Sequence, residues 1–203
     1  EDIDSYDQLH QWSIDNIHEF WGEIWDYTKI VHSSNYNKVV DDETKMPGAK
    51  WFPGARLNFA ENLLRYKDSR PAIHFKGEGK PIITLSYHEI YNEVEKLSHA
   101  LRSLGIKKGD RVAGFVPNIP QAIIAMLATT SIGAVWSSSS PDFGIKGVLD
   151  RFSQIKPKII FAADGYYYNG KRFNSLDKLN HIVKNLPTVQ KVVIIEYLNE
   201  NPE

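Results

Sequence analysis

The spacing of hydrophobic residues becomes regular from Ser86 onward. Segments with an apolar residue at every third or fourth position alternate with short runs that are almost entirely apolar. The first pattern is typical of amphipathic helices, and the second of strands that a parallel sheet buries on both faces. The expected helices span 86–104, 120–133, 144–155 and 175–186, and the expected strands span 111–117, 134–139, 158–163 and 191–198. This alternation predicts an α/β fold with a doubly wound, mostly parallel sheet and flanking helices.

Residues that start or stop helices support these boundaries. Ser86 and Glu89 have the spacing of a capping box, in which each side chain bonds the backbone of the other residue. Pro120 suits the first turn of a helix, where its missing N–H would have no partner. Gly105 and Gly133 follow helical segments at the position where a left-handed glycine commonly ends a helix.

The N-terminal part is predicted to be helical. Residues 5–32 are expected to form one helix that starts at Ser5, with Gln8 at capping-box spacing. Apolar and mostly bulky residues recur along one face of this helix, which suits packing against a larger body. They are Ile14, Ile17, Phe20, Trp21, Ile24 and Trp25. Residues 33–50 are polar and interrupted by Pro and Gly, so we expect a loop or arm there.

A short helix and a β-hairpin are expected before the regular part. The helix begins near Asn58, and "KGEGK" at 76–80 separates two strand-like runs. We therefore predict two domains. Residues 1–70 would form an α-helical N-terminal extension with a linker arm, and residues 71–203 would form an α/β subdomain that begins with the hairpin.

Composition excludes several classes of protein. The chain has 203 residues, a formal net charge of −1 and no cysteine. The charge gives no indication of nucleic-acid binding, and the absence of cysteine excludes disulfides and a thiol nucleophile. The absence of cysteine is also consistent with a cytoplasmic protein. No apolar run approaches the roughly 20 residues of a membrane span. The acidic start is not a signal peptide, and because it lacks Met we expect a piece of a longer chain.

One strand end nearly matches a nucleotide-binding motif. Ligands of doubly wound sheets bind beyond the carboxyl ends of the strands. There, "GYYYNGKR" at 165–172 fits the Walker pattern except that Arg172 replaces the Ser or Thr that holds Mg²⁺. Three tyrosines also occupy the part that must curl its amides around phosphate, so we reject an NTP-binding loop. Two interpretations remain open: a solvated basic turn, or a loop in which Asn169, Gly170, Lys171 and Arg172 hold another phosphate.

A second strand end offers polar groups. "SSSSPDFG" contains four serines, 137–140, and Asp142, which could cap a helix that begins near Gly144. A helix N-terminus favours anions, but an ordinary strand-to-helix loop has the same sequence features. The seven histidines show no metal-binding spacing, and no nucleophile elbow or dinucleotide fingerprint is present. We assign no catalytic residue and no metal ligand to the chain.

Several runs together resemble a known family. "WFPGARLNFAENLLR", "GDRVAGFVPN", "AMLATTSIGAVWSSSSPDFG", "GVLDRFSQIKPKIIF" and "YNGK" are similar to the N-terminal part of the adenylate-forming acyl-CoA synthetases. The resemblance covers about residues 6–198, and "WSSSSPDFG" with "GVLDRF" points to the acetoacetyl branch. It implies a ligase in which ATP and acetoacetate form an acyl-adenylate and CoA then displaces AMP. The α/β part would be the incomplete first subdomain of a large adenylation domain.

The resemblance also assigns a role to the near-Walker segment. Related acetyl-CoA synthetases contact the CoA nucleotide through a basic loop at this position, which implies CoA-binding residues here. They are Tyr168, Asn169, Gly170 and Lys171, and Pro141 and Asp142 lie near the same channel. Arg172 could assist as a second cation, although it matches no contact of the family. Tyr168 stands where those relatives have an arginine. The family's motifs for ATP and Mg²⁺ lie downstream, so the chain alone is expected to be inactive.

Two alternatives to the ligase interpretation remain. The chain could be a non-catalytic module that binds CoA or a nucleotide and ends near residue 203. It could also be an interaction domain that docks through its aromatic helix. The expected partners are small molecules (acetoacetate, ATP and CoA) rather than nucleic acid or membrane. A fragment would also expose surface meant for missing subdomains, so we expect it to self-associate.

Overall fold

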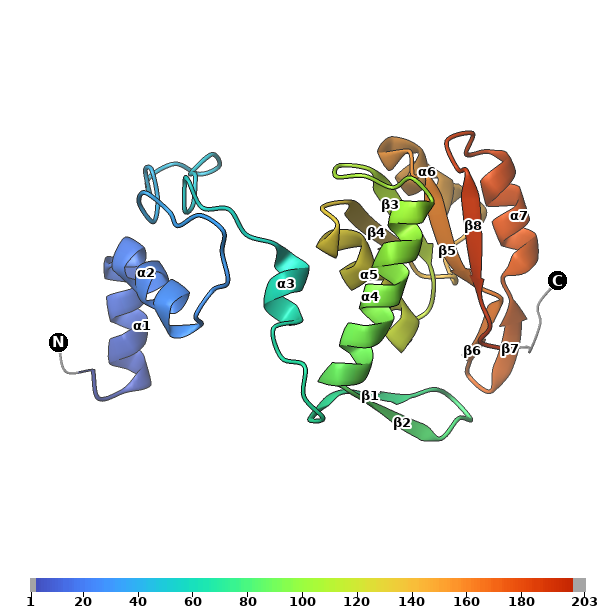
Figure 1. The fold of residues 1–203 in the computed structure, drawn as a ribbon, viewed down its shortest axis with the longest axis horizontal. Coiled ribbons are helices and arrows are strands. Elements are labelled where there is room, and N and C mark those ends of the chain that lie inside the picture. The colour runs from blue at the N-terminus through green and yellow to red at the C-terminus, as the bar shows by residue number, and fades with distance from the viewer. Residues whose placement is uncertain (1–2, 199–203) are drawn as a thin grey trace. The chain divides into compact units, whose positions relative to one another are not determined.

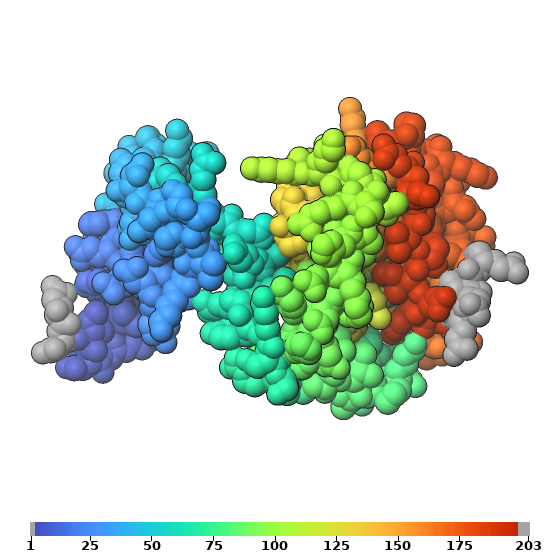
Figure 2. Space-filling model, in the orientation of Figure 1, coloured from blue at the N-terminus to red at the C-terminus, as the bar shows by residue number. Residues whose placement is uncertain are grey.

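The computed structural model describes residues 3–198 and divides into two compact units, 1–62 and 63–203. The first unit contains α1 (Tyr6–Asp15), α2 (Ile17–Tyr27) and most of α3 (Phe59–Leu63). The second unit packs as one body of helices and strands (Figures 1 and 2). The boundaries predicted from the sequence, 1–70 and 71–203, differ from this division by several residues and stay a prediction; 1–2 and 199–203 lie outside the described residues.

The single helix predicted over 5–32 is wrong, because Asn16 interrupts it. Asn16 lies between α1 and α2 with φ −127° and ψ 54°, outside the helical region. Its side-chain amide and its backbone N–H both donate to the Trp12 carbonyl, at 3.2 and 2.9 Å. A short polar side chain that bonds the backbone in this way competes with the continuing helix. The helix α2 ends at Tyr27, before Lys29 takes a left-handed conformation with φ 50°.

The start of α1 agrees in part with the predicted capping box. Ser5 Oγ accepts a hydrogen bond from the Gln8 N–H at 3.2 Å, as expected for an N-cap. The Gln8 side chain accepts from the N–H of Asp4 at 2.7 Å instead of from that of Ser5. Ser5 is therefore the cap, but the reciprocal bond is shifted by one residue.

The aromatic face of α2 packs on the loop that follows it. The Trp25 ring is buried, with its centroid 4.8 Å from that of Phe52 and 5.2 Å from that of Tyr36. Two isolated β-bridges, Ser34–Arg56 and Val40–Trp51, hold the loop against itself. The polar stretch 33–50 is a loop, as predicted, and its Tyr36 packs against Trp25 and Phe52 in this small core.

The second unit begins with the predicted hairpin and a long helix. Strands β1 (Pro71–Lys76) and β2 (Ile82–Ser86) pair antiparallel. Helix α4 (Tyr87–Ser103) follows at once, and Ser86 and Glu89 form the complete capping box predicted from their spacing. Gly105, with φ 81°, ends this helix as expected.

Four parallel strands form the central sheet of the second unit, in the order β4-β3-β5-β8. The remaining elements that build it are β3 (Arg111–Phe115), α5 (Pro120–Ser131), β4 (Val135–Ser139), α6 (Ile145–Ile155), β5 (Ile159–Ala163), α7 (Leu176–Lys184) and β8 (Lys191–Ile195). This confirms the α/β fold with a parallel sheet and flanking helices. No helix in the described part of the chain has the length and apolar composition of a membrane span.

Alternate residues of the strands face different helices. Phe115, Ile160 and Ala162 point to one side, where they form a fully buried core with Val148 and Phe152 of α6. The other side meets α4 and α5. Strand β4, which follows β3 and α5 in the chain, lies at one edge of the sheet, and β8, which comes after β5, lies at the opposite edge. The direction of winding therefore reverses between β3 and β5, which is where ligands of such sheets bind.

Candidate functional site

The near-Walker segment is a β-hairpin at the carboxyl end of β5. Strands β6 (Gly165–Tyr168) and β7 (Lys171–Asn174) pair antiparallel, with Asn169 and Gly170 as the two turn residues. Their φ angles of 50° and 73° are those of a type I′ turn, for which Asn-Gly is a preferred pair. The prediction of a loop at 165–172 is therefore wrong, because these residues form two strands joined by a tight turn. The tyrosines are extended, and their amides do not curl around a phosphate.

The hairpin separates the two basic residues that the sequence placed together. Neighbouring residues of a strand point to opposite faces, so Lys171 and Arg172 lie on different faces of the hairpin. The Arg172 guanidinium donates to the Leu198 carbonyl at 2.9 Å and lies 5.8 Å from the centre of the Tyr167 ring. The Arg172 guanidinium therefore bonds another part of the same chain. Lys171 lies opposite Tyr168 in the strand register, next to the exposed turn.

The amide at the tip already has an acidic partner. The Gly170 N–H donates to Oε1 of Glu78 at 2.6 Å. Glu78 belongs to the turn between β1 and β2, 92 residues earlier, and this contact places the tips of the two hairpins side by side (Figure 1). The sequence placed Gly170 in a possible phosphate-binding loop but gave no indication of Glu78, because no local pattern connects residues so far apart.

The loop after β4 carries two further candidate residues, Pro141 and Asp142. Pro141 is buried, and its carbonyl accepts a hydrogen bond from the Lys178 ammonium at 3.2 Å. Burial raises the pKa of the Tyr166 hydroxyl, and the nearby negative charge of Asp142 raises this pKa further. The charge of Asp142 therefore acts on Tyr166 of the hairpin. The prediction that Asp142 caps the next helix is wrong, because the N-cap of α6 is Gly144 and no side chain bonds there.

A buried carboxylate fixes the base of the hairpin. Asp164 follows β5 directly and is fully buried. Its Oδ1 accepts hydrogen bonds from the backbone N–H groups of Tyr197 at 2.8 Å and Leu198 at 2.9 Å. The chain that follows β8 is thereby tied to the point where the hairpin begins. Asp164 could not be singled out from the sequence, because its partners lie 33 and 34 residues further along the chain.

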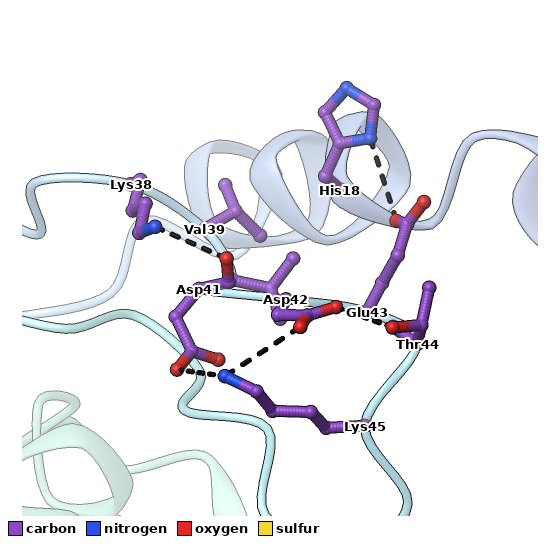
Figure 3. A pocket seen from close by; sticks show the side chains of 9 residues that line it. His18, Lys38, Val39, Asp41, Asp42, Glu43, Thr44 and Lys45 are labelled. Atoms are coloured by element: carbon purple, nitrogen blue, oxygen red, sulfur yellow. Dashed lines mark hydrogen bonds and ion pairs between the residues drawn. The ribbon is translucent and has the colours of Figure 1, made fainter.

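The first unit has an acidic depression whose groups are already paired. It is lined by His18 and by residues 38–45 of the loop (Figure 3). The Lys45 ammonium lies 3.3 Å from an Asp41 carboxylate oxygen and 3.6 Å from one of Asp42. A hydrogen bond from the Lys50 backbone, and then Lys45 itself, lower the pKa of Asp41. Within residues 3–198 no cluster of three or more acidic or histidine side chains could hold a metal ion.

Comparison with protein families gives two matches that together cover most of the chain. A family model described as AMP-binding enzyme matches residues 59–203. A second model, described as acetyl-coenzyme A synthetase N-terminus, matches residues 6–63. The border between the two matches falls close to the border between the two structural units.

Individual relatives are similar over nearly the whole chain. Acetoacetyl-CoA synthetase of Macaca fascicularis is 48% identical over 97% of this chain and 30% of its own length. Malonamoyl-CoA synthetase of Penicillium aethiopicum is 41% identical over 94% of this chain and 27% of its own length. The solved structure of acetoacetyl-CoA synthetase from Streptomyces lividans superposes with a TM-score of 0.91 and 41% identity, covering 99% of this chain and 32% of that one. The chain thus spans about 30% of the length of the curated relatives that it matches.

Proposed function

Because this chain belongs to the AMP-binding enzyme family, we propose that it is part of an ATP-dependent ligase that joins acetoacetate to CoA. The observation that carries the proposal is the 48% identity, over almost all of its residues, to proteins that are acetoacetyl-CoA synthetases. The match of residues 6–63 to the N-terminal region of acetyl-coenzyme A synthetases supports an N-terminal place in the ligase.

The proposed reaction has two halves. An oxygen of the acetoacetate carboxylate attacks the α-phosphorus of ATP, which forms acetoacetyl-adenylate and releases pyrophosphate. The sulfur of CoA then attacks the acyl carbon, and AMP leaves with the carboxyl oxygen as part of its phosphate. Mg²⁺ and cationic groups would stabilise the charge that develops on the phosphate. We assign neither a metal ligand nor a catalytic residue to this chain, because the family's motifs for ATP and Mg²⁺ are expected downstream of it.

We assign the CoA contact of the second half to the tip of the β6–β7 hairpin. The Lys171 ammonium can donate to a phosphate oxygen, and a hydrogen bond between two charged groups is stronger than a neutral one. Tyr168, Asn169 and Gly170 would line the nucleotide. Support comes from the position of the hairpin, which follows β5 at the reversal of the sheet, where ligands of this fold class bind.

The remaining candidate residues differ in what they can contribute to CoA binding. Arg172 bonds the Leu198 carbonyl and points to the face opposite Lys171, so its role is to hold the hairpin. Asp142 is acidic and would accept hydrogen bonds from hydroxyl or amino groups of CoA, not from its phosphates. The buried Pro141 shapes the loop that carries it.

The experiment is an assay of the whole protein with a panel of carboxylates. Acetoacetate, malonamate, acetate and butyrate would each be tested for exchange of labelled pyrophosphate into ATP and for formation of the CoA thioester. Malonamate is included because a relative with 41% identity is a malonamoyl-CoA synthetase. We expect the highest kcat/KM with acetoacetate. Absence of acetoacetate-dependent exchange would refute the proposal, and a preference for malonamate would reassign its substrate.

Two further expectations belong to the same proposal. Residues 1–203 alone should catalyse no exchange, because the groups that bind ATP and Mg²⁺ are expected downstream of this segment. The enzyme is expected to act in the cytoplasm on small molecules. A fluorescent fusion of the whole protein, imaged in its source cells, tests this location.

A further inference from the structure

The contact between the two hairpin tips joins an acidic side chain to the proposed phosphate site. The carboxylate of Glu78 accepts the Gly170 N–H at 2.6 Å, directly beside Lys171. A carboxylate oxygen and a phosphate oxygen have the same requirement, an N–H donor and a nearby cation. In the structure, the backbone donor at the tip therefore already holds an anion that belongs to the chain itself.

The turn that carries Glu78 has a fixed conformation. The Lys80 N–H donates to the Gly77 carbonyl at 3.1 Å, and Gly79 adopts a left-handed φ of 69°. The Lys80 ammonium donates to the Tyr197 carbonyl and lies 4.1 Å from the centre of the Tyr197 ring. Because Lys80 fastens this turn to the segment after β8, Glu78 is held at the tip by more than its own bond.

The geometry of the β6–β7 turn makes the Gly170 N–H available to an outside acceptor. In a two-residue hairpin turn, the closing hydrogen bonds involve the residues on either side, here Tyr168 and Lys171. The N–H of the second turn residue takes no part in them. A single N–H cannot form a full hydrogen bond to a carboxylate and to a phosphate at the same time. A phosphate bound beside the Glu78 carboxylate would also be repelled by its negative charge.

We propose that Glu78 is an internal competitor at the CoA site, a carboxylate that occupies the phosphate position at the hairpin tip and must leave before CoA binds there. The inference rests on the proposed function, because it assumes that the tip contacts CoA. Glu78 then weakens the binding of every ligand that places a phosphate at Gly170. It has no effect on ATP-dependent formation of the adenylate, which needs no CoA.

The test compares Glu78→Gln and Glu78→Ala in the whole protein. Glutamine keeps an oxygen that can accept the Gly170 N–H but removes the charge, whereas alanine removes both. We expect each variant to lower the Kd for CoA by about threefold to tenfold, the effect of removing one nearby like charge in water. Pyrophosphate exchange should be unchanged. Glu95→Gln, the same change of charge on the exposed side of α4, is the control and should leave the Kd as it is.

The opposite result would overturn the inference. If Glu78 only braced the tip, Glu78→Ala would weaken CoA binding and Glu78→Gln would not change it. An unchanged Kd for CoA in both variants would also contradict the proposal that the Glu78 carboxylate competes with CoA. Lys171→Ala separates this failure from failure of the proposed function. If Lys171→Ala weakens CoA binding while the Glu78 variants do not strengthen it, only the role of Glu78 is refuted. If Lys171→Ala also has no effect, the hairpin is not the CoA contact.

Discussion

Asp164 shows how a single side chain determines the position of the candidate site. It is fully buried, and its carboxylate bonds two backbone N–H groups of the segment that follows β8. Removing this acceptor leaves the half-buried N–H groups of Tyr197 and Leu198 without their hydrogen-bond partner. A buried polar group that loses its partner costs about 1–3 kcal/mol, and hydrogen bonds to charged groups lie at the upper end.

The residue-scale prediction is that Asp164→Ala destabilises this chain by about 2–4 kcal/mol, which is about 1–2 kcal/mol for each of the two half-buried donors. Urea unfolding followed by circular dichroism would measure the change. Asp150→Ala on the exposed side of α6 is the control, and surface changes of this kind stay within about 0.5 kcal/mol. Equal stability of the two variants would mean that the Asp164 carboxylate does not hold the segment after β8.

What could be predicted at the residue scale depended on the distance along the chain. The Ser86 and Glu89 capping box was confirmed because both partners lie within one helical turn. Glu78 was missed although its turn was predicted, because its partner Gly170 is 92 residues away. Asp164 was missed for the same reason, since its partners lie 33 and 34 residues further on. Spacing rules apply to residues that are close in the sequence, whereas the contacts of Glu78 and Asp164 form only when distant segments come together in the fold.

At the scale of elements, the β6–β7 hairpin depends on its Asn-Gly turn. Gly170 has a φ of 73°, a conformation that costs a residue with a Cβ atom about 1–2 kcal/mol. The strands on either side have only four residues each, and one stacked pair, Tyr166 on Phe173 at 5.2 Å, supports them. So short a hairpin has little stability to lose.

We therefore expect Gly170→Ala to open the hairpin locally. Hydrogen exchange of peptides from 165–174 should become faster, by about fivefold to thirtyfold for the strain given above. Gly147→Ala is the matched control. Gly147 lies inside α6, where alanine is favoured by about 0.5–1 kcal/mol, so exchange in that helix should become slower. Unchanged exchange at 165–174 in Gly170→Ala would contradict the turn assignment.

Element prediction succeeded where one pattern had only one interpretation. The helices and strands from Ser86 to β5 were confirmed because the apolar periodicity and the alternation of helix and strand agreed throughout, although the predicted Asp142 cap of α6 was wrong. The segment 165–174 was misread although Asn-Gly is a strong hairpin signal, because its spacing of Gly and Lys also suggests a phosphate loop. The break at Asn16 was missed because the apolar spacing continues through it, while the decisive hydrogen bonds go to the backbone of Trp12.

At the scale of the whole molecule, the second unit has an open apolar groove of 380 Å³. Leu97 of α4, Ile124 of α5 and Val193 of β8 are among its lining residues. In the described chain, β8 pairs with β5 alone, so its outer edge is also available for pairing. Together these features form a surface on which another apolar element can pack.

The prediction at this scale is that residues 1–203 alone form dimers or larger oligomers through this groove. Ile124→Glu should convert them to monomers, because it places a charge in the apolar contact. Ile82→Glu, on an exposed position of β2 outside the groove, should not. Light scattering after gel filtration measures the mass. A monomer at high concentration in the unchanged chain would contradict the prediction.

The central claim is that the 165–174 hairpin serves the CoA half of a two-step ligase and not the ATP half. The most direct test is Lys171→Ala in the whole protein, with both halves measured on the same sample. The claim predicts that the Kd for CoA rises by about fivefold to 100-fold, the effect of losing one charge-assisted hydrogen bond. Acetoacetate-dependent exchange of pyrophosphate into ATP should stay unchanged. An unchanged Kd for CoA, or a loss of exchange equal to the loss of CoA binding, would contradict the claim.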